Sequence, residues 1–174
     1  MPLTANALLD MSQDELDDLF RASTAGPIPV GEAAGTVIVH PGGVLADIVA
    51  EASEAIAWQG KVFDPATKTL RNKVGPAGAK QVVAAVDFGT SWFDQQQCVV
   101  LDYSQTSTLA KSVRDEIRQV EPGLYLGIVF IGERKTINFA LDFNAPAERQ
   151  GIVHRILAKV RGLFGQGRKP GGAP

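Results

Sequence analysis

Polar residues that could carry out chemistry are spread over the middle of the chain and do not form one known motif. Asp102 and Tyr103 follow a β-branched segment, so on a strand their side chains would point to opposite faces. A carboxyl group or phenol held in an apolar interior can serve as a general acid or base. These two residues are the candidate catalytic groups, and the alternative for Asp102 is an outward carboxylate at a strand end.

A second set of residues could hold a small molecule without transforming it. Aromatic rings can line an apolar cavity, a phenol or an amide can hydrogen-bond a ligand oxygen, and a guanidinium can bind a carboxylate through two donors. Packing within the core is the alternative for the aromatic residues, and exposure to solvent is the alternative for the arginine. The candidate ligand-binding residues are Trp58, Phe63, Tyr103, Arg114, Tyr125 and Asn138.

Lys61 and Cys98 have simpler interpretations. On a strand Lys61 shares a face with Phe63, yet a lysine at the surface is the expected outcome. Cys98 is the single cysteine, which excludes an intramolecular disulfide, and we interpret it as a small buried residue. The two histidines are His40 and His154, too few for a usual metal site. We expect neither a metal nor a cofactor.

The sequence lacks the motifs and composition that are typical of several classes of function. The glycine-rich phosphate-binding motifs and the Gly-x-Ser-x-Gly motif of serine hydrolases do not occur. The formal net charge of -2 argues against a nucleic-acid partner. The first ten residues do not resemble a secretory signal, and no apolar run is long enough to span a membrane. We therefore expect a cytoplasmic protein.

The local patterns predict an alternation of strands with a few helices. Ser12 and Glu15 form a capping box that begins a helix over 12–22, and apolar residues at helical spacing predict another over 43–56. An Asp-Pro turn predicts a hairpin. The predicted strands in this part of the chain are 35–40, 58–63, 69–74, 81–88 and 97–103.

Residues 108–120 are predicted to form a helix. Leu109, Val113, Ile117 and Val120 recur at helical spacing, and the charged residues between them would lie on a solvated face. Pairs three and four residues apart would support that helix. On this interpretation Arg114 or Arg118 could reach over the mouth of a barrel to bind a ligand carboxylate or phosphate.

The strands 124–131 and 134–143 are predicted to form a hairpin. Gly132 and Glu133 suit a two-residue turn, which sets residue 131 opposite 134. Continuing that register places Gly127 opposite Asn138 and Leu126 opposite Phe139, with Tyr125 and Phe139 on different faces.

The C-terminal part of the chain has a basic character. Residues 147–164 are predicted to form an amphipathic helix with a basic face, and 165–174 a disordered tail. Through 147–169 the chain could contact an anionic membrane surface or an acidic protein. Packing of the apolar stripe on the chain's own barrel is the alternative.

Together these elements predict a mainly β (α+β) protein. A chain of 174 residues can bury one well-developed core, and six or seven antiparallel strands predict a barrel or a strongly curved sheet with capping helices. We divide the chain into an N-terminal helix and linker (1–30), a barrel-like domain (31–146), the basic helix (147–164) and the tail (165–174).

Three segments carry a family resemblance: WQGKVF at 58–63, VVLDYSQTS at 99–107 and VRDEIRQVEPGLYLG at 113–127. They resemble a group of uncharacterised bacterial proteins, and the strand pattern is similar to that of calycin barrels such as the lipocalins. The resemblance implies binding of an apolar or amphipathic small molecule, such as a lipid, in the barrel. A cofactor-independent isomerase or cyclase in the same cavity, and a docking module acting through the C-terminal helix, are the alternatives.

Overall fold

The computed structural model describes residues 2–38, 58–74, 82–106 and 110–145. Within these residues two short helices precede eight strands, and the strands close into one barrel in sequence order with every neighbouring pair antiparallel. The predicted mainly β class is therefore confirmed. The elements are α1 (Ala5–Leu9), α2 (Gln13–Ala22), β1 (Gly31–Ile38), β2 (Trp58–Asp64), β3 (Thr69–Val74), β4 (Val83–Thr90), β5 (Gln97–Asp102), β6 (Val113–Glu121), β7 (Leu124–Ile131) and β8 (Arg134–Asp142).

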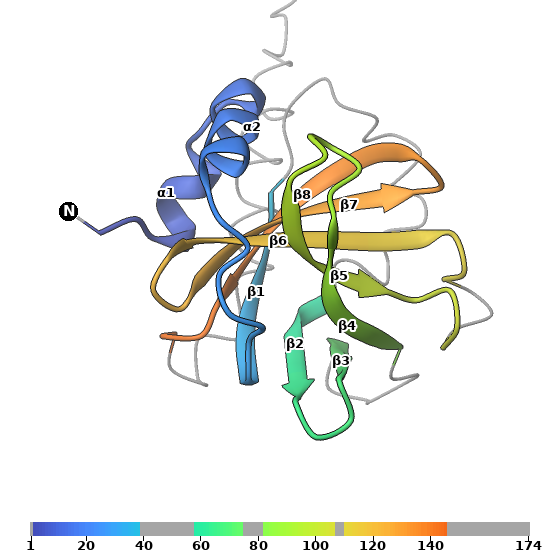
Figure 1. The fold of residues 1–174 in the computed structure, drawn as a ribbon. Coiled ribbons are helices and arrows are strands. Elements are labelled where there is room, and N and C mark those ends of the chain that lie inside the picture. The colour runs from blue at the N-terminus through green and yellow to red at the C-terminus, as the bar shows by residue number, and fades with distance from the viewer. Residues whose placement is uncertain (1, 39–57, 75–81, 107–109, 146–174) are drawn as a thin grey trace, which may run out of the picture.

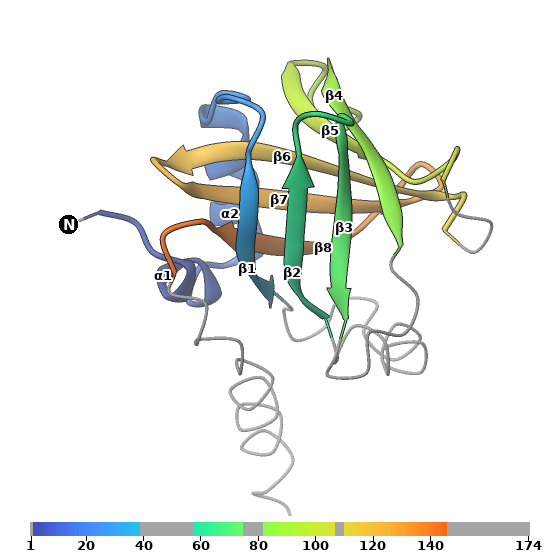
Figure 2. The same ribbon diagram turned by 90° about the horizontal axis from the view of Figure 1, so that it is seen from below.

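The barrel has two sides whose strands run in different directions (Figure 1). Seen from below, β1, β2 and β3 lie side by side and cross β6, β7 and β8 behind them (Figure 2). Side chains from both sides meet in the interior, which in a barrel of eight strands can be filled by side chains or hold one small ligand. The interior core consists of Ala33, Phe63, Leu70, Ala84, Val86, Val99, Leu101, Tyr103, Ile117, Tyr125, Phe139 and Leu141.

The two helices cover the outer face of the barrel beside β6, β7 and β8 (Figure 1). Helix α2 begins at the predicted capping box, in which Ser12 and Glu15 each accept from the other's backbone N–H. Its buried residues Leu16 and Phe20 join Leu126 and Ile128 of β7 in a second apolar cluster. The short helix α1, which contacts β1 and β8, was not predicted from the sequence.

The predicted helix over 108–120 is wrong, because this segment contains strand β6. It pairs with both β5 and β7 and so completes the barrel. The helical spacing of Val113 and Ile117 is also a strand spacing, with Asp115 between them on the inner face. Of the charges that were expected to face solvent, Asp115, Glu116 and Arg118 are buried and Arg114 is half-buried, and each of these four has an oppositely charged partner. Lys111, just before the strand, is exposed.

The predicted turn between β7 and β8 is confirmed, but the predicted register holds only at its start. Ile131 pairs with Arg134 and Phe130 with Lys135, and then an irregularity shifts the pairing so that Val129 lies opposite Ile137. Phe139 consequently lies opposite Gly127 and inside the barrel with Tyr125, contrary to the prediction. A side chain at position 127 would collide with the ring of Phe139, which lies 2.2 Å from the position of a Cβ there.

The remaining strand predictions are close to the observed bounds. The hairpin of β2 and β3 is confirmed, β1 begins earlier than predicted, and β4 starts two residues later and continues to Thr90. The predicted helices 43–56 and 147–164, the tail 165–174 and both histidines lie outside the described residues. Among the described residues, neither helix has the length and apolar character needed to cross a membrane.

Candidate binding site inside the barrel

A lysine lies inside the barrel, although a position at the surface was expected for it. Lys61 is in the middle of β2, and its side chain is 4% exposed. The expectation of a surface lysine is therefore wrong. The strand alternation gives the reason: Phe63 packs in the interior, and Lys61 shares its face.

Lys61 is held by three acceptors from three other segments of the barrel. Its Nζ lies 2.8 Å from Oδ2 of Asp115 on β6, 2.6 Å from the hydroxyl of Tyr103 after β5, and 2.9 Å from Oδ1 of Asn72 on β3. Tyr103 in turn donates to Oδ2 of Asp115 at 3.0 Å. We call these four residues the interior polar cluster.

Aromatic rings surround the ammonium group of Lys61. Its Nζ lies 5.5 Å from the ring centre of Trp58, 5.3 Å from that of Tyr103 and 5.4 Å from that of Phe139, distances at which a cation is attracted to an aromatic face. The indole N–H of Trp58 donates to Oδ1 of Asn72 at 3.2 Å. An apolar wall with a few convergent polar groups is typical of a small-molecule site.

Burial and charge set the protonation of this cluster. Burial disfavours the charged form of Lys61, but the neighbouring Asp115 and Tyr103 outweigh it and raise the pKa of Lys61 to about 12. Burial, followed by the negative charge of Asp115, raises the pKa of Tyr103 to about 12. At neutral pH Lys61 is therefore an ammonium and Tyr103 a neutral phenol.

Another part of the interior lies against the segment before β1. Tyr125 donates to the backbone oxygen of Pro27 at 2.8 Å, and Ile28 packs against the interior core. Phe143 contacts Tyr125 and Phe63 there, with ring centres 5.7 Å apart in both pairs. Of the predicted ligand-binding residues, Tyr125 and Phe63 thus contact Phe143, whereas Trp58 and Tyr103 lie at the interior polar cluster.

Three other predicted site residues lie away from the interior. Arg114 is on the outer face of β6, where it donates to Glu116 and to the backbone oxygen of Thr90. Asn138 is on the outer face of β8 and accepts from Gln13 of α2. Asp102 alternates with the interior residue Leu101 and accepts from the backbone N–H of Ser104.

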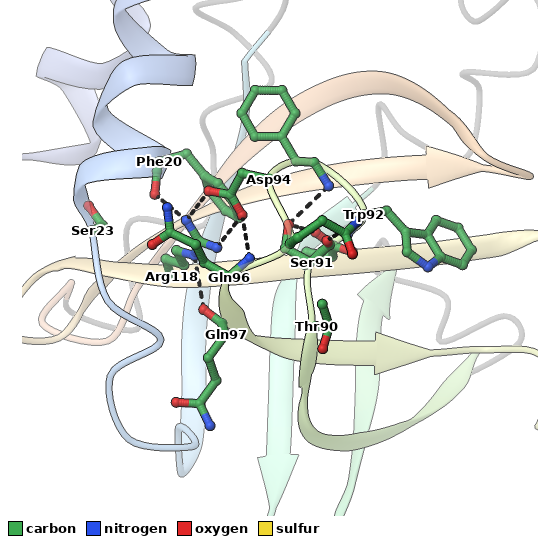
Figure 3. A network of polar contacts seen from close by, with 12 residues as sticks. Phe20, Ser23, Thr90, Ser91, Trp92, Asp94, Gln96, Gln97 and Arg118 are labelled. Atoms are coloured by element: carbon green, nitrogen blue, oxygen red, sulfur yellow. Dashed lines mark hydrogen bonds and ion pairs between the residues drawn. The ribbon is translucent and has the colours of Figure 1, made fainter.

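A second polar network lies on the outer face and fixes the loop between β4 and β5 (Figure 3). Arg118 is fully buried, and it bonds to Asp94 and to the backbone oxygens of Phe20 and Gln97. Glu116, also fully buried, accepts from Ser91 and from the backbone N–H of Trp92. Because both carboxylate oxygens of Asp94 and of Glu116 accept hydrogen bonds within the chain, we assign this network to the stability of the fold.

Lys61, Asn72 and Asp115 were not predicted from the sequence as site residues. The shared face of Lys61 and Phe63 was the one signal that could have indicated Lys61. Asp115 could not be found while its segment was taken for a helix. Among the described residues, no three His, Cys, Asp or Glu side chains come together as a metal site would require.

Comparison with known proteins shows the fold and no family. No protein-family model matches the chain, and no curated protein does. A solved structure, the crystal structure of a protein from Thermomonospora curvata, aligns with a TM-score of 0.57 at 15% sequence identity, over 78% of this chain and 89% of that one. The chain is thus similar in fold to that protein, and the eight-stranded antiparallel barrel is compatible with ligand binding.

Proposed function

We propose that this protein binds an apolar or amphipathic small molecule inside the barrel, with the interior polar cluster as the polar end of the site. The observation that carries the proposal is the buried ion pair between Lys61 and Asp115, which lies beside the interior core of the barrel. The calycin-like role implied by the sequence resemblance belongs to the same proposal.

The energetics of buried charges support this interpretation. Removing two charges from water costs several kcal/mol per ion, and replacing such a pair by apolar residues of similar volume is often neutral or stabilising. A barrel of this size can fill its interior with apolar side chains alone. The inner pair also differs from the outer pair of Arg118 and Asp94: among the described residues Oδ1 of Asp115 receives no hydrogen bond, whereas both oxygens of Asp94 do. These two observations support recognition of a ligand by the pair of Lys61 and Asp115.

The catalytic alternative remains a prediction. It relied on Asp102 or Tyr103 for proton transfer, and of these two only Tyr103 points into the interior. Asp115, hydrogen-bonded to Tyr103, would take the place of Asp102. Conversion of a bound molecule to an isomer on incubation with the protein would support this alternative.

The docking alternative concerns 147–169, which lie outside the described residues. It stays a prediction based on the basic composition of that segment. Its test is sedimentation with anionic vesicles, which should fall with salt and disappear when the chain is truncated after Pro146.

Native mass spectrometry tests the proposed function, followed by denaturing extraction of any bound compound. We expect the purified protein to retain a cellular molecule with a largely apolar body. The matched control is the double variant Lys61→Met/Asp115→Leu, which removes both charges together and should fold but lose that molecule. An empty native protein that also fails to bind added apolar compounds would contradict the proposal.

A further inference from the structure

We infer that the ligand is a neutral alcohol with an apolar body, whose hydroxyl group donates a hydrogen bond to Oδ1 of Asp115. This inference rests on the proposed function and deepens it, because it names the chemical class that the interior polar cluster selects. Most of the hydrogen-bonding groups of the cluster already have partners within the chain.

The ammonium group of Lys61 has no proton left for a ligand. Its three N–H donors match three acceptors, on Asn72, Tyr103 and Asp115, at 2.6 to 2.9 Å. A ligand carboxylate or phosphate would therefore have to displace one of these bonds to reach Lys61.

Tyr103 and the carbonyl of Asn72 are also fully engaged. The Tyr103 hydroxyl donates to Asp115 and lies within hydrogen-bond distance of Lys61 Nζ and of Nδ2 of Asn72, the latter at 3.3 Å. Oδ1 of Asn72 accepts from both Lys61 and Trp58. What Asn72 can still offer is one N–H of its half-buried amide.

Asp115 retains an acceptor with no partner. Both of its hydrogen bonds fall on Oδ2, and among the described residues Oδ1 receives none, although the side chain is only 5% exposed. A buried carboxylate oxygen without a donor is unfavourable. The site is thus completed by a hydrogen-bond donor.

The charge of the cluster narrows the choice of donor. Lys61 and Asp115 neutralise each other, so a ligand carboxylate would add an unpaired negative charge beside Asp115 and an ammonium would add a positive charge beside Lys61. An ether is neutral but has no donor. A hydroxyl group is neutral, donates to Asp115 and can accept the remaining N–H of Asn72.

Competition among compounds of matched size tests this inference on the native protein. The fluorescence of N-phenyl-1-naphthylamine, a neutral apolar probe with an N–H donor, reports binding, and 1-octanol, its isomer heptyl methyl ether and ionised octanoate compete with the probe. We expect 1-octanol to displace the probe at a concentration about tenfold lower than the other two, because only the alcohol satisfies Asp115 without adding charge.

The result that would overturn the inference is displacement by octanoate or the ether at the same concentration as 1-octanol. Failure of both the probe and 1-octanol to bind would instead overturn the proposed function. In Asp115→Asn the concentrations at which 1-octanol and octanoate displace the probe should differ less than in the native protein. The substitution Asp87→Asn, at an exposed position on β4, should leave that difference unchanged. If Asp115→Asn fails to fold, the comparison of the three compounds on the native protein still tests whether the site selects an alcohol.

Discussion

The guanidinium of Arg118 and the carboxylate of Asp94 form an ion pair through two parallel hydrogen bonds, both 2.6 Å long. Arg118 also donates to the backbone oxygen of Phe20, near the C-terminal end of α2, at 2.8 Å. One side chain on β6 therefore joins the N-terminal helix, the loop between β4 and β5, and the barrel wall (Figure 3). Such a bidentate contact between an arginine and a carboxylate is among the stronger ion pairs in proteins.

Replacing Arg118 by Met should destabilise the protein by about 3–5 kcal/mol, because Asp94 and two backbone oxygens lose their donor at a buried position. The free energy of unfolding in urea measures this change. Arg71→Met, at an exposed position on β3, is the matched control and should change it by no more than about 0.5 kcal/mol. Equal effects of the two substitutions would contradict the structural role of Arg118.

The same ion pair predicts a loss of stability in acid. Hydrogen bonds from Arg118 hold the pKa of Asp94 below its ordinary value of 3.8. A group whose pKa is lower in the folded state stabilises the protein above its unfolded pKa, and this contribution is lost as the pH falls through the folded value. The free energies of unfolding of the native protein and of Asp94→Asn should therefore differ most near neutral pH and become equal in acid. A difference that stays constant below pH 3.8 would contradict this assignment.

The two tyrosines should resist ionisation in the folded protein. Burial raises the pKa of Tyr125, and burial together with Asp115 raises the pKa of Tyr103 to about 12. Tyrosinate absorbance should therefore remain low through pH 10 in the native protein and rise near that pH in the unfolded chain. The Tyr103→Phe variant should lose the step near pH 12. A native step at or below pH 10 that disappears in Tyr103→Phe would argue against a buried Tyr103.

The interior polar cluster also predicts a loss of stability at high pH. Lys61 has a raised pKa, so its contribution is complete below 10.5 and is lost as the pH rises to about 12. Tyr103 acts in the same direction, because the unfolded phenol ionises near 10.0 while the folded one stays neutral. The free energy of unfolding should fall between pH 10 and 12, and less steeply in Tyr103→Phe. An identical slope in the two proteins would contradict this coupling.

Cys98 should be unreactive in the native protein. It is buried, as the sequence analysis predicted, and burial together with the nearby charge of Glu116 raises the pKa of its thiol to about 12. Reaction with a disulfide reagent at neutral pH should be slow in buffer and fast in urea. Equal rates in the two conditions would show that the thiol is exposed.

The sequence predicted those parts of the fold that depend on local patterns. The capping box at Ser12, the hairpin of β2 and β3 and the turn at Gly132 were all recognisable, because each is set by a few neighbouring residues. The register beyond that turn was not recognisable, because the irregularity near Thr136 adds one residue to β8. Side chains of β8 after it therefore point to the face opposite to the predicted one.

The site was harder to predict because it depends on partners that are distant in the chain. Lys61 and Asp115 are separated by 54 residues, and each alone has the pattern of a solvent-exposed charge. In the folded barrel they form a buried ion pair between the inner faces of β2 and β6. Trp58 and Tyr103 were found by residue type, whereas Asn72 carried no signal of its own.

The two tryptophans provide the most direct test of binding inside the barrel. Trp58 lies at the interior polar cluster, whereas Trp92 is on the outer face against Phe130 and 45% exposed. In a titration of the 15N-labelled protein with 1-octanol, the account predicts that the indole N–H signal of Trp58 shifts while that of Trp92 stays in place. A Trp58 signal that does not move at saturating ligand, or a shift confined to Trp92, would contradict binding within the barrel.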